Sequence, residues 1–299
     1  MTGPITTTQL DDGIATIVAA NALGALRANT VLARLVNRDW ENEVASYGQT
    51  VNIISRGALT AQDKAEGSAV TLQQPTDSKV QLTLNKHKEV SILMEDLVRM
   101  LNRPDQFAGF IADAVTVIAE QIDADIAGLY SGLSQSVNAL AGLSESHFRS
   151  ARRLLNAAKA PMSQRYAVLN EDADYEFLGI EKVVNSEYAQ SLGNAAAGAF
   201  MGRFMGFDVF MDQKIVTASS EGKNLAFHRN AFVAAFRPMA LAAPGLGVQQ
   251  VTMDEDGIGL RVTRSYSPTY LGEQVTIDIL YGVAELRDSH GVVIRTTDI

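Results

Sequence analysis

Cysteine is absent from this chain of 299 residues, and long uninterrupted apolar runs are missing as well. Without thiols the chain can form no disulfide, no thiolate nucleophile and no zinc–thiolate site. No apolar run reaches the roughly 18 residues of a membrane-spanning helix, and the N-terminus lacks the basic flank and apolar core of a signal peptide. The composition is 46% hydrophobic, so we expect a chain with a sizeable core, no membrane span and a cytoplasmic origin.

Clustered positive charge is also scarce. The formal net charge is −9, and the densest basic stretches are Arg149 with Arg152 and Arg153, and Arg34 with Arg38. Neither stretch amounts to a patch in the sequence alone. Because proteins that grip nucleic acid do so mainly through phosphate contacts from a basic surface, we expect no tight direct binding of DNA.

Catalytic and metal-binding motifs are lacking too. The histidines have no metal-ligand spacing and lie in no nucleophile motif, so we expect them to be surface or locally hydrogen-bonded residues. They are His87, His147, His228 and His290. Glu120, Asp123 and Asp125 could together ligate a hard cation or act as acid and base. A solvated or subunit-facing side of an amphipathic helix explains them more simply, so we expect no catalytic, cofactor-binding or metal-binding residues.

The most informative segment is a predicted hairpin at residues 48–95. Its first arm, Thr50–Arg56, alternates apolar and polar side chains, and its second arm does so from Lys79 to Ile92. The tip between them, Gly57–Pro75, is polar and has no core-forming run. If the arms paired along their length, about 17 residues each, the ribbon would reach roughly 55 Å. An isolated two-stranded ribbon is marginal in water, so we expect a neighbouring subunit to support it.

A long amphipathic helix is predicted immediately afterwards, with Asn102 as its cap and Pro104 in its first turn. Its apolar residues recur at steps of three and four and form one continuous stripe. The stripe contains Phe107, Phe110, Ile111, Ala114, Val115, Ile118, Ile122, Ile126 and Leu129. From Pro104 to Tyr130 this helix would span about 40 Å.

The remaining segments divide into three kinds. Residues 10–38 are predicted to be helical, with breaks near Gly24 and Asn29. Ser144 is expected to cap a helix that stops before Pro161, and short helices and strands alternate from there to about residue 243. From Val248 onward strands dominate, with a hairpin turn at Asp256–Gly257. Strands at both ends of the chain predict that the middle is an insertion into a sheet built from the ends.

This order of arm, hairpin and long helix resembles the major capsid proteins of tailed phages with the Hong Kong 97-type fold. The resemblance extends to short phrases in the rest of the chain. These are Arg165–Asn170 as a strand before a helix, Leu225–Arg229 as a strand before another helix, and Arg261–Tyr266, Val275–Gly282 and Val292–Ile294 as closing strands. It implies an α+β fold with an N-terminal arm (1–47), an extended hairpin loop with sheet strands (48–95), a spine helix and peripheral domain (96–143), an axial domain (144–247) and returning strands (248–299).

The resemblance also implies a structural function without catalysis. Copies of the chain would form pentamers and hexamers of an icosahedral virion shell, assembled in the host cytoplasm. The shell would enclose DNA without sequence-specific binding and would have a portal protein. Because the chain begins at the arm, a separate scaffolding protein is expected. The candidate subunit-interface residues are Arg56, Asp63, Lys64, Glu66, Arg34 and Arg38. Some relatives link a lysine of this loop to an asparagine of another subunit; for Lys64 an ordinary solvated lysine is the simpler expectation.

Two alternatives remain open at this point. An encapsulin, a cellular compartment with the same fold, would enclose protein cargo, so the contents of purified particles distinguish it. An α+β enzyme with an unrecognised site would carry a bound cofactor or metal after purification.

Overall fold

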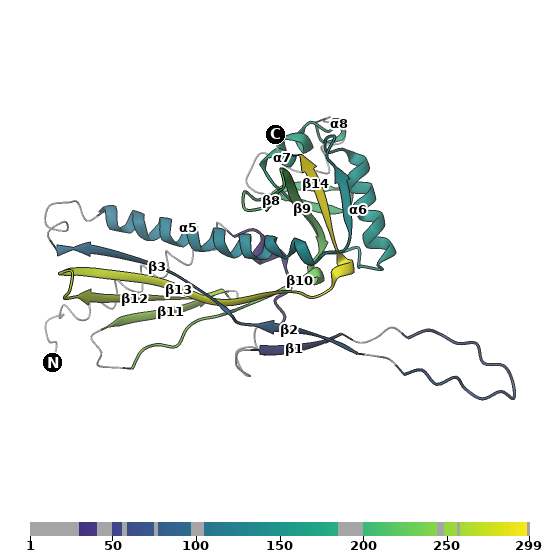
Figure 1. Ribbon diagram of the computed structural model, residues 1–299, viewed down its shortest axis with the longest axis horizontal. Coiled ribbons are helices and arrows are strands. Elements are labelled where there is room, and N and C mark those ends of the chain that lie inside the picture. The colour runs from purple at the N-terminus through teal and green to yellow at the C-terminus, as the bar shows by residue number, and fades with distance from the viewer. Residues whose placement is uncertain are drawn as a thin grey trace, which may run out of the picture.

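In the described residues, the computed structural model has three β-sheets of two, five and seven strands, a long helix against the five-stranded sheet and a loop that projects far from the body (Figure 1). It describes residues 30–40, 50–55, 59–74, 77–96, 105–184, 200–243, 248–255 and 258–297. Most of the predicted N-terminal helical segment, residues 10–38, therefore lies outside the described residues.

A five-stranded antiparallel sheet combines three C-terminal strands with two strands from earlier in the chain. Its strands are β3 (Lys86–Glu95), β10 (Phe232–Arg237), β11 (Gln249–Glu255), β12 (Ile258–Ser267) and β13 (Gly272–Glu285). β3 pairs with β13 over ten residues, so an early strand and a late strand are neighbours. This pairing joins an early and a late segment around the middle of the chain, as predicted, but the last strand, β14 (Gly291–Thr297), belongs to the other sheet, so the predicted insertion is matched only in part. Glu255 pairs with Ile258, and the predicted turn at Asp256–Gly257 lies outside the described residues.

The long helix α5 (Asp105–Ala127) lies along this sheet and ends in the 3₁₀ turn η1 (Gly128–Gly132). Its 23 residues correspond to about 35 Å. From Ala114 onward the predicted apolar stripe is confirmed, because Val115, Ile118, Ile122 and Ile126 are buried in the same core as Ile277 of β13. The cap at Asn102 and the side chains of Phe107, Phe110 and Ile111 lie outside the described residues.

The second sheet has seven strands and carries two helices on one face. Its strands are β4 (Ser136–Ala139), β5 (Arg165–Leu169), β6 (Phe200–Phe204), β7 (Phe207–Met211), β8 (Thr217–Ala218), β9 (Glu221–His228) and β14 (Gly291–Thr297). The helices α6 (Glu145–Ala157) and α7 (Glu171–Leu178) pack through Phe148 and Phe177, whose ring centroids are 5.5 Å apart, and α8 (Glu181–Val184) follows. Ser144 caps α6, which confirms the predicted cap of this helix, and Asn170 caps α7.

One predicted connection is wrong. Leu225–Arg229 was expected to lead into a helix, but β9 continues into the 3₁₀ turn η2 (Arg229–Ala231) and then into β10. The His228 side chain accepts a hydrogen bond from the Asn230 backbone N–H, which favours a single turn. The residues that follow are buried on both faces of β10, and such a continuous apolar run suits a strand inside a core.

The sheets also cross two of the expected domain boundaries. β4 falls in the range 96–143 but pairs with β14 of the seven-stranded sheet. β10 falls in the range 144–247 but pairs with β13 of the five-stranded sheet. Each sheet is therefore built from segments far apart in the sequence.

The hairpin is shorter in its paired part than expected. β1 (Thr50–Ser55) pairs with β2 (Ser78–Thr83) over six residues, and β3 leaves the ribbon to join β13. The expectation that the two arms pair along their full length is thus wrong. Val90 and Ile92 pack against the main core, whereas an isolated ribbon would leave both side chains without apolar partners. The base of the ribbon has a core of its own, in which Val51, Ile53, Leu82 and Leu84 meet Val233 and Ala235 of β10.

Candidate assembly surfaces and a buried junction

The loop tip, residues 59–74, is exposed throughout. Among the described residues, its hydrogen bonds stay within the tip itself: Thr60 N–H, for example, donates to Gln73 Oε1 at 2.9 Å, and Ser68 Oγ donates to the Ala65 carbonyl at 2.8 Å. Three large apolar side chains are exposed here, Leu59 and Val70 at 67% and Leu72 at 90%. A segment with apolar side chains in water and no core beneath them gains stability only from another surface.

Three of the predicted interface residues, Asp63, Lys64 and Glu66, lie together in this tip and are exposed. The Lys64 ammonium donates to the adjacent Ala65 carbonyl at 2.9 Å. Arg56 lies outside the described residues. Their role in a subunit interface stays a prediction.

The other two predicted interface residues lie on the body. Arg34 is exposed on the short helix α2 (Leu32–Leu35). The Arg38 guanidinium lies over the Phe236 ring, 5.2 Å from its centroid. The structure therefore does not bring the two groups of predicted residues together within one subunit (Figure 1).

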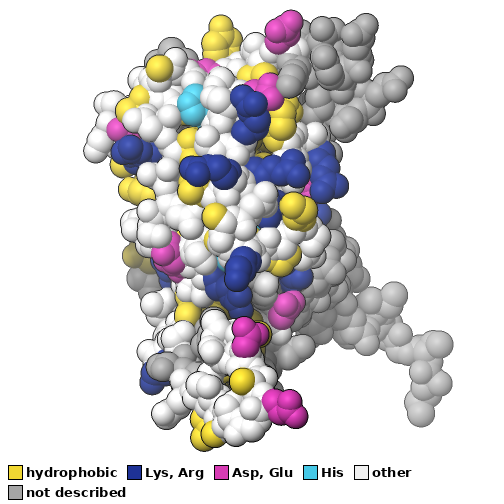
Figure 2. Space-filling view, turned by 90° about the vertical axis from the view of Figure 1, so that its right-hand side faces the viewer, with side chains coloured by type: hydrophobic (Ala, Val, Ile, Leu, Met, Phe, Trp, Pro, Cys, Tyr) yellow, Lys and Arg dark blue, Asp and Glu magenta, His cyan; other side chains and the backbone are white. Residues whose placement is uncertain are grey.

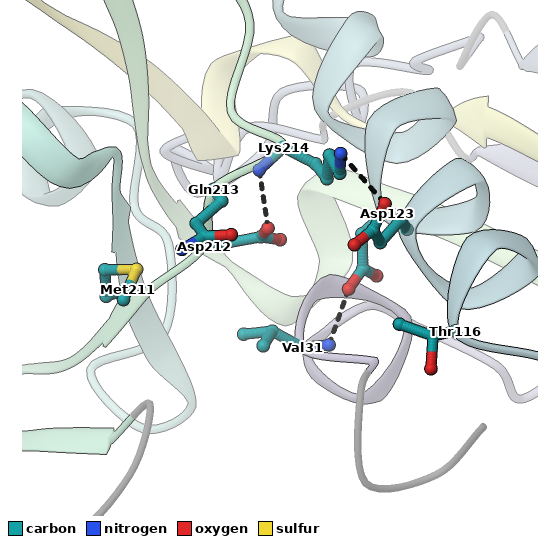
Figure 3. Close-up of a pocket in the computed structure, with 8 residues that line it drawn as sticks. Val31, Thr116, Asp123, Met211, Asp212, Gln213 and Lys214 are labelled. Carbon is teal, nitrogen blue, oxygen red and sulfur yellow. Dashed lines mark hydrogen bonds and ion pairs between the residues drawn. The ribbon is translucent and has the colours of Figure 1, made fainter. Parts of the chain in front are cut away.

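A buried carboxylate joins α5 to the segment that holds α2 (Figure 3). Asp123 accepts hydrogen bonds from the backbone N–H groups of Val31 at 2.6 Å and Ala33 at 3.0 Å. The first N–H groups of a helix have no partner within the helix, so an acceptor from elsewhere can satisfy them. Asp123 thus fastens residues 31–33 to the long helix.

The same carboxylate borders a cavity of about 170 Å³ beside the turn that follows β7 (Figure 3). Asp212 accepts from the Lys214 backbone N–H at 2.8 Å, and the Lys214 ammonium pairs with Glu120 at 2.9 Å. Burial raises the pKa of Asp123 to about 7, and Asp212 adds to the rise, while the backbone hydrogen bonds lower it. Burial also raises the pKa of Asp212. The cavity therefore joins α5, residues 31–33 and the turn after β7.

The expectation of a solvated or subunit-facing acidic side of the helix is wrong for Asp123, which is 1% exposed. Residues 31–33 cover this side of α5 and supply the donors that make burial of a carboxylate possible. Asp125 is also engaged within the subunit, because it accepts from the Tyr281 hydroxyl at 2.6 Å and pairs with Lys86 at 3.2 Å. Sequence reasoning missed these contacts because their partners lie 92 and 156 residues away.

The prediction of surface or locally hydrogen-bonded histidines holds for His87, His147 and His228 and is wrong for His290, which is buried. His87 bonds to Asp278 at 2.8 Å, and His147 accepts from the Ser144 backbone N–H at 3.0 Å. His228 and His290 are both buried, with ring centroids 5.7 Å apart. Burial lowers the pKa of His228 to about 4 and also lowers that of His290. The pairing of β9 with β14 brings the two together.

Within the described residues, no cluster of three or more His, Asp or Glu side chains could hold a metal ion. In that same part of the chain, no helix is long and apolar enough to cross a membrane.

No protein-family model matches the chain, and no curated protein matches its sequence. Solved structures do match. A chain of Mycobacterium phage Che8 is 20% identical with a TM-score of 0.64, covering 89% of this chain and 90% of that one. A chain of the Ralstonia phage GP4 capsid is 11% identical with a TM-score of 0.62, covering 88% and 87%. A chain of the cyanophage P-SCSP1u capsid is 12% identical with a TM-score of 0.59, covering 90% and 89%. The chain therefore has the fold of phage capsid subunits, and the predicted α+β capsid fold is confirmed.

Proposed function

We propose that this chain is the major capsid protein of a tailed phage, which assembles with copies of itself into a closed shell around DNA. The fold shared with phage capsid chains over about nine-tenths of the sequence supports this function. Its role would be structural, without catalysis. The five-stranded sheet with α5 would form the peripheral domain, and the seven-stranded sheet with α6 and α7 the axial domain.

The observation that carries the proposal is the loop tip. Leu59, Val70 and Leu72 are exposed on a segment that has no core within the subunit. Exposing such side chains is unfavourable in a monomer and becomes favourable when a neighbouring copy covers them. Asp63, Lys64 and Glu66 would then form rim contacts, each contributing about 0–1 kcal/mol. Arg34, Arg38 and Arg56 would contribute further polar contacts between copies.

Many copies of weak interfaces can hold a closed shell, because each subunit contacts several neighbours at once. Pentamers and hexamers of the chain, a separate scaffolding protein and a portal protein would complete the assembly. Enclosed DNA would be confined without sequence-specific contacts, and the virion would be the final location of the protein.

Electron microscopy of the purified protein, alone and with its scaffold, tests this function. We expect closed shells or curved sheets, and DNA as the content of filled particles. Particles filled with an enzyme would indicate a cellular compartment instead, and strict monomers under every condition would contradict the proposal.

A matched variant links assembly to the loop. Replacing residues 59–74 with a short Gly-Ser turn removes the tip and leaves β1, β2 and their core contacts intact. We expect a folded subunit with an unchanged melting temperature that cannot complete shells. Normal shells from this variant would show that the tip is not an element of the subunit interface.

A further inference from the structure

Helix α6 presents a basic surface on a chain whose net charge is −9. Phe148, Ala151 and Leu155 are fully buried against the seven-stranded sheet and thereby fix which side of α6 faces outward. Arg149, Arg153 and Lys159 are exposed in and just after this helix. Figure 2 shows Lys and Arg side chains gathered over the upper and middle part of the face that includes α6.

Acidic partners are few around this surface, which we call the α6 basic face and define as Arg149, Arg153 and Lys159. Arg149 lies 3.7 Å from Glu145, and the pair is largely exposed on the arginine side. Among the described residues, Arg153 and Lys159 form no ion pair. Neighbouring Arg152 donates to the Met205 carbonyl at 3.1 Å and pairs with no carboxylate in the part of the chain that the structure describes. The α6 basic face therefore keeps a net positive charge.

We infer that the α6 basic face lines the interior of the shell and contacts the phosphates of the enclosed duplex DNA. The inference rests on the proposed function, because it needs a shell that contains DNA. Arg149 and Arg153 lie one helical turn apart, about 6 Å along the axis, so both can reach one phosphate strand. The arginine fork binds phosphate oxygens in a bidentate manner and reads no sequence.

Weak contacts are sufficient in this setting. A single subunit with two or three phosphate contacts binds DNA poorly at physiological salt, which agrees with the acidic overall charge. Inside a filled shell the DNA is held next to every subunit, so weak contacts repeated over all copies act together. The α6 basic face would then offset part of the repulsion between the DNA and a shell of acidic subunits.

The first test asks which side of the shell carries the α6 basic face. The chain has no cysteine, so Arg153→Cys introduces a single thiol. In intact shells we expect a large poly(ethylene glycol) maleimide to leave this thiol unmodified and a small maleimide to label it. After the shells are opened with urea, both reagents should react. Labelling of intact shells by the large reagent would place α6 outside and overturn the inference.

The second test measures binding of a 30-base-pair duplex to unassembled subunits across a salt series. Losing two phosphate contacts in Arg149→Glu/Arg153→Glu should reduce the slope of log affinity against log salt by about 1.8. The control Lys79→Glu/Lys88→Glu makes the same change of charge on β2 and β3 and should keep the wild-type slope. Equal slopes for the two variants would overturn the inference, because the α6 basic face would then make no phosphate contacts. This holds even if the thiol of Arg153→Cys is shielded from the large maleimide in intact shells, since a contact between copies would shield it as well. Failure of the wild-type protein to form any shell would instead contradict the proposed function.

Discussion

The two ends of the β1–β2 hairpin differ sharply, although they belong to one continuous segment. At the base, Val51, Ile53 and Leu82 are buried against Val233 and Ala235 of β10. At the tip, every residue from 59 to 74 is exposed, and Leu72 is 90% exposed. The base is held by the subunit's own core, whereas the tip projects beyond it (Figure 1).

This difference separates folding from assembly within one hairpin. Side chains at the base contribute to the free energy of unfolding of the subunit. Side chains at the tip contribute almost nothing to that free energy, so their apolar character needs another explanation, which a neighbouring copy supplies. Substitutions at the two ends should therefore fail in different assays.

The largest effect is expected from Leu82→Asp at the base. Leu82 is fully buried, and a carboxylate in its place would have no partner in an apolar core. An unpaired buried charge costs several kcal/mol, so the variant should be largely insoluble or should melt far below the wild type. Differential scanning calorimetry of the soluble fraction measures the change.

Leu72→Asp is the matched substitution at the tip. The carboxylate would stay in water, so the melting temperature of the subunit should change by no more than a degree or two. Shell formation, followed by sedimentation, should be strongly reduced because the apolar contact is lost. A folded Leu82→Asp variant, or normal shells from Leu72→Asp, would remove the distinction between base and tip.

Gly282→Ala tests how closely the base packs. A Cβ atom at Gly282 of β13 would lie 2.1 Å from the Thr83 carbonyl oxygen and 3.2 Å from the Leu84 Cα. The backbone of β2 would have to move away from β13, and overpacking of this kind costs about 1–3 kcal/mol. Urea unfolding should show this loss. Gly67→Ala at the tip is the control, because nothing lies within 4 Å of its added Cβ, although its positive φ adds a small local strain.

The sequence predicted the elements better than their partners. The spacing of Ala114, Val115, Ile118 and Ile122 predicted the long helix correctly, because an apolar stripe at helical spacing is a local signal. The structure buries all four residues in the main core. The pairing of Val90 and Ile92 was assigned to the wrong strand. Alternation shows that a segment is a half-buried strand, but it contains no information about which of several strands covers it.

The candidate sites show the same limit. Asp63, Lys64 and Glu66 could be placed in an exposed tip, because the segment lacks any core-forming run. The buried state of Asp123 could not be predicted, since its donors, Val31 and Ala33, lie about 90 residues earlier. A charged residue on an amphipathic helix is normally expected to face solvent. Only the tertiary fold shows that Asp123 is an exception.

A smaller effect, dependent on pH, is expected where Asp123 fastens residues 31–33. Its pKa is raised to about 7, so the folded protein keeps a proton that the unfolded chain releases near pH 4. The contribution of this group to stability is therefore present at low pH and is lost as pH rises toward 7. Between pH 5 and pH 8 the loss should be about 2–3 kcal/mol, at roughly 1.36 kcal/mol for each of about two pH units.

Asp123→Asn removes this titration. The difference in unfolding free energy between pH 5 and pH 8 should shift by about that amount relative to the wild type. Groups remote from Asp123, such as His228 with its lowered pKa, titrate in both proteins and cancel in the comparison, whereas the titration of Asp212 is coupled to that of Asp123. Identical pH profiles for the two proteins would mean that Asp123 stays ionised across this range.

The smallest perturbation leaves the sequence unchanged and compares two lysines of the same hairpin. Lys64 lies in the tip and Lys79 lies in β2, and both side chains are exposed. Trypsin needs a locally unfolded backbone, and the backbone of Lys79 is held in the ladder opposite Ile54, whereas that of Lys64 is in no ladder. Mass spectrometry of free subunits should therefore detect cleavage after Lys64 well before cleavage after Lys79. In assembled shells cleavage after Lys64 should slow sharply, because a neighbouring copy then covers the tip. Equal rates at Lys64 in free and assembled protein would show that the tip stays uncovered.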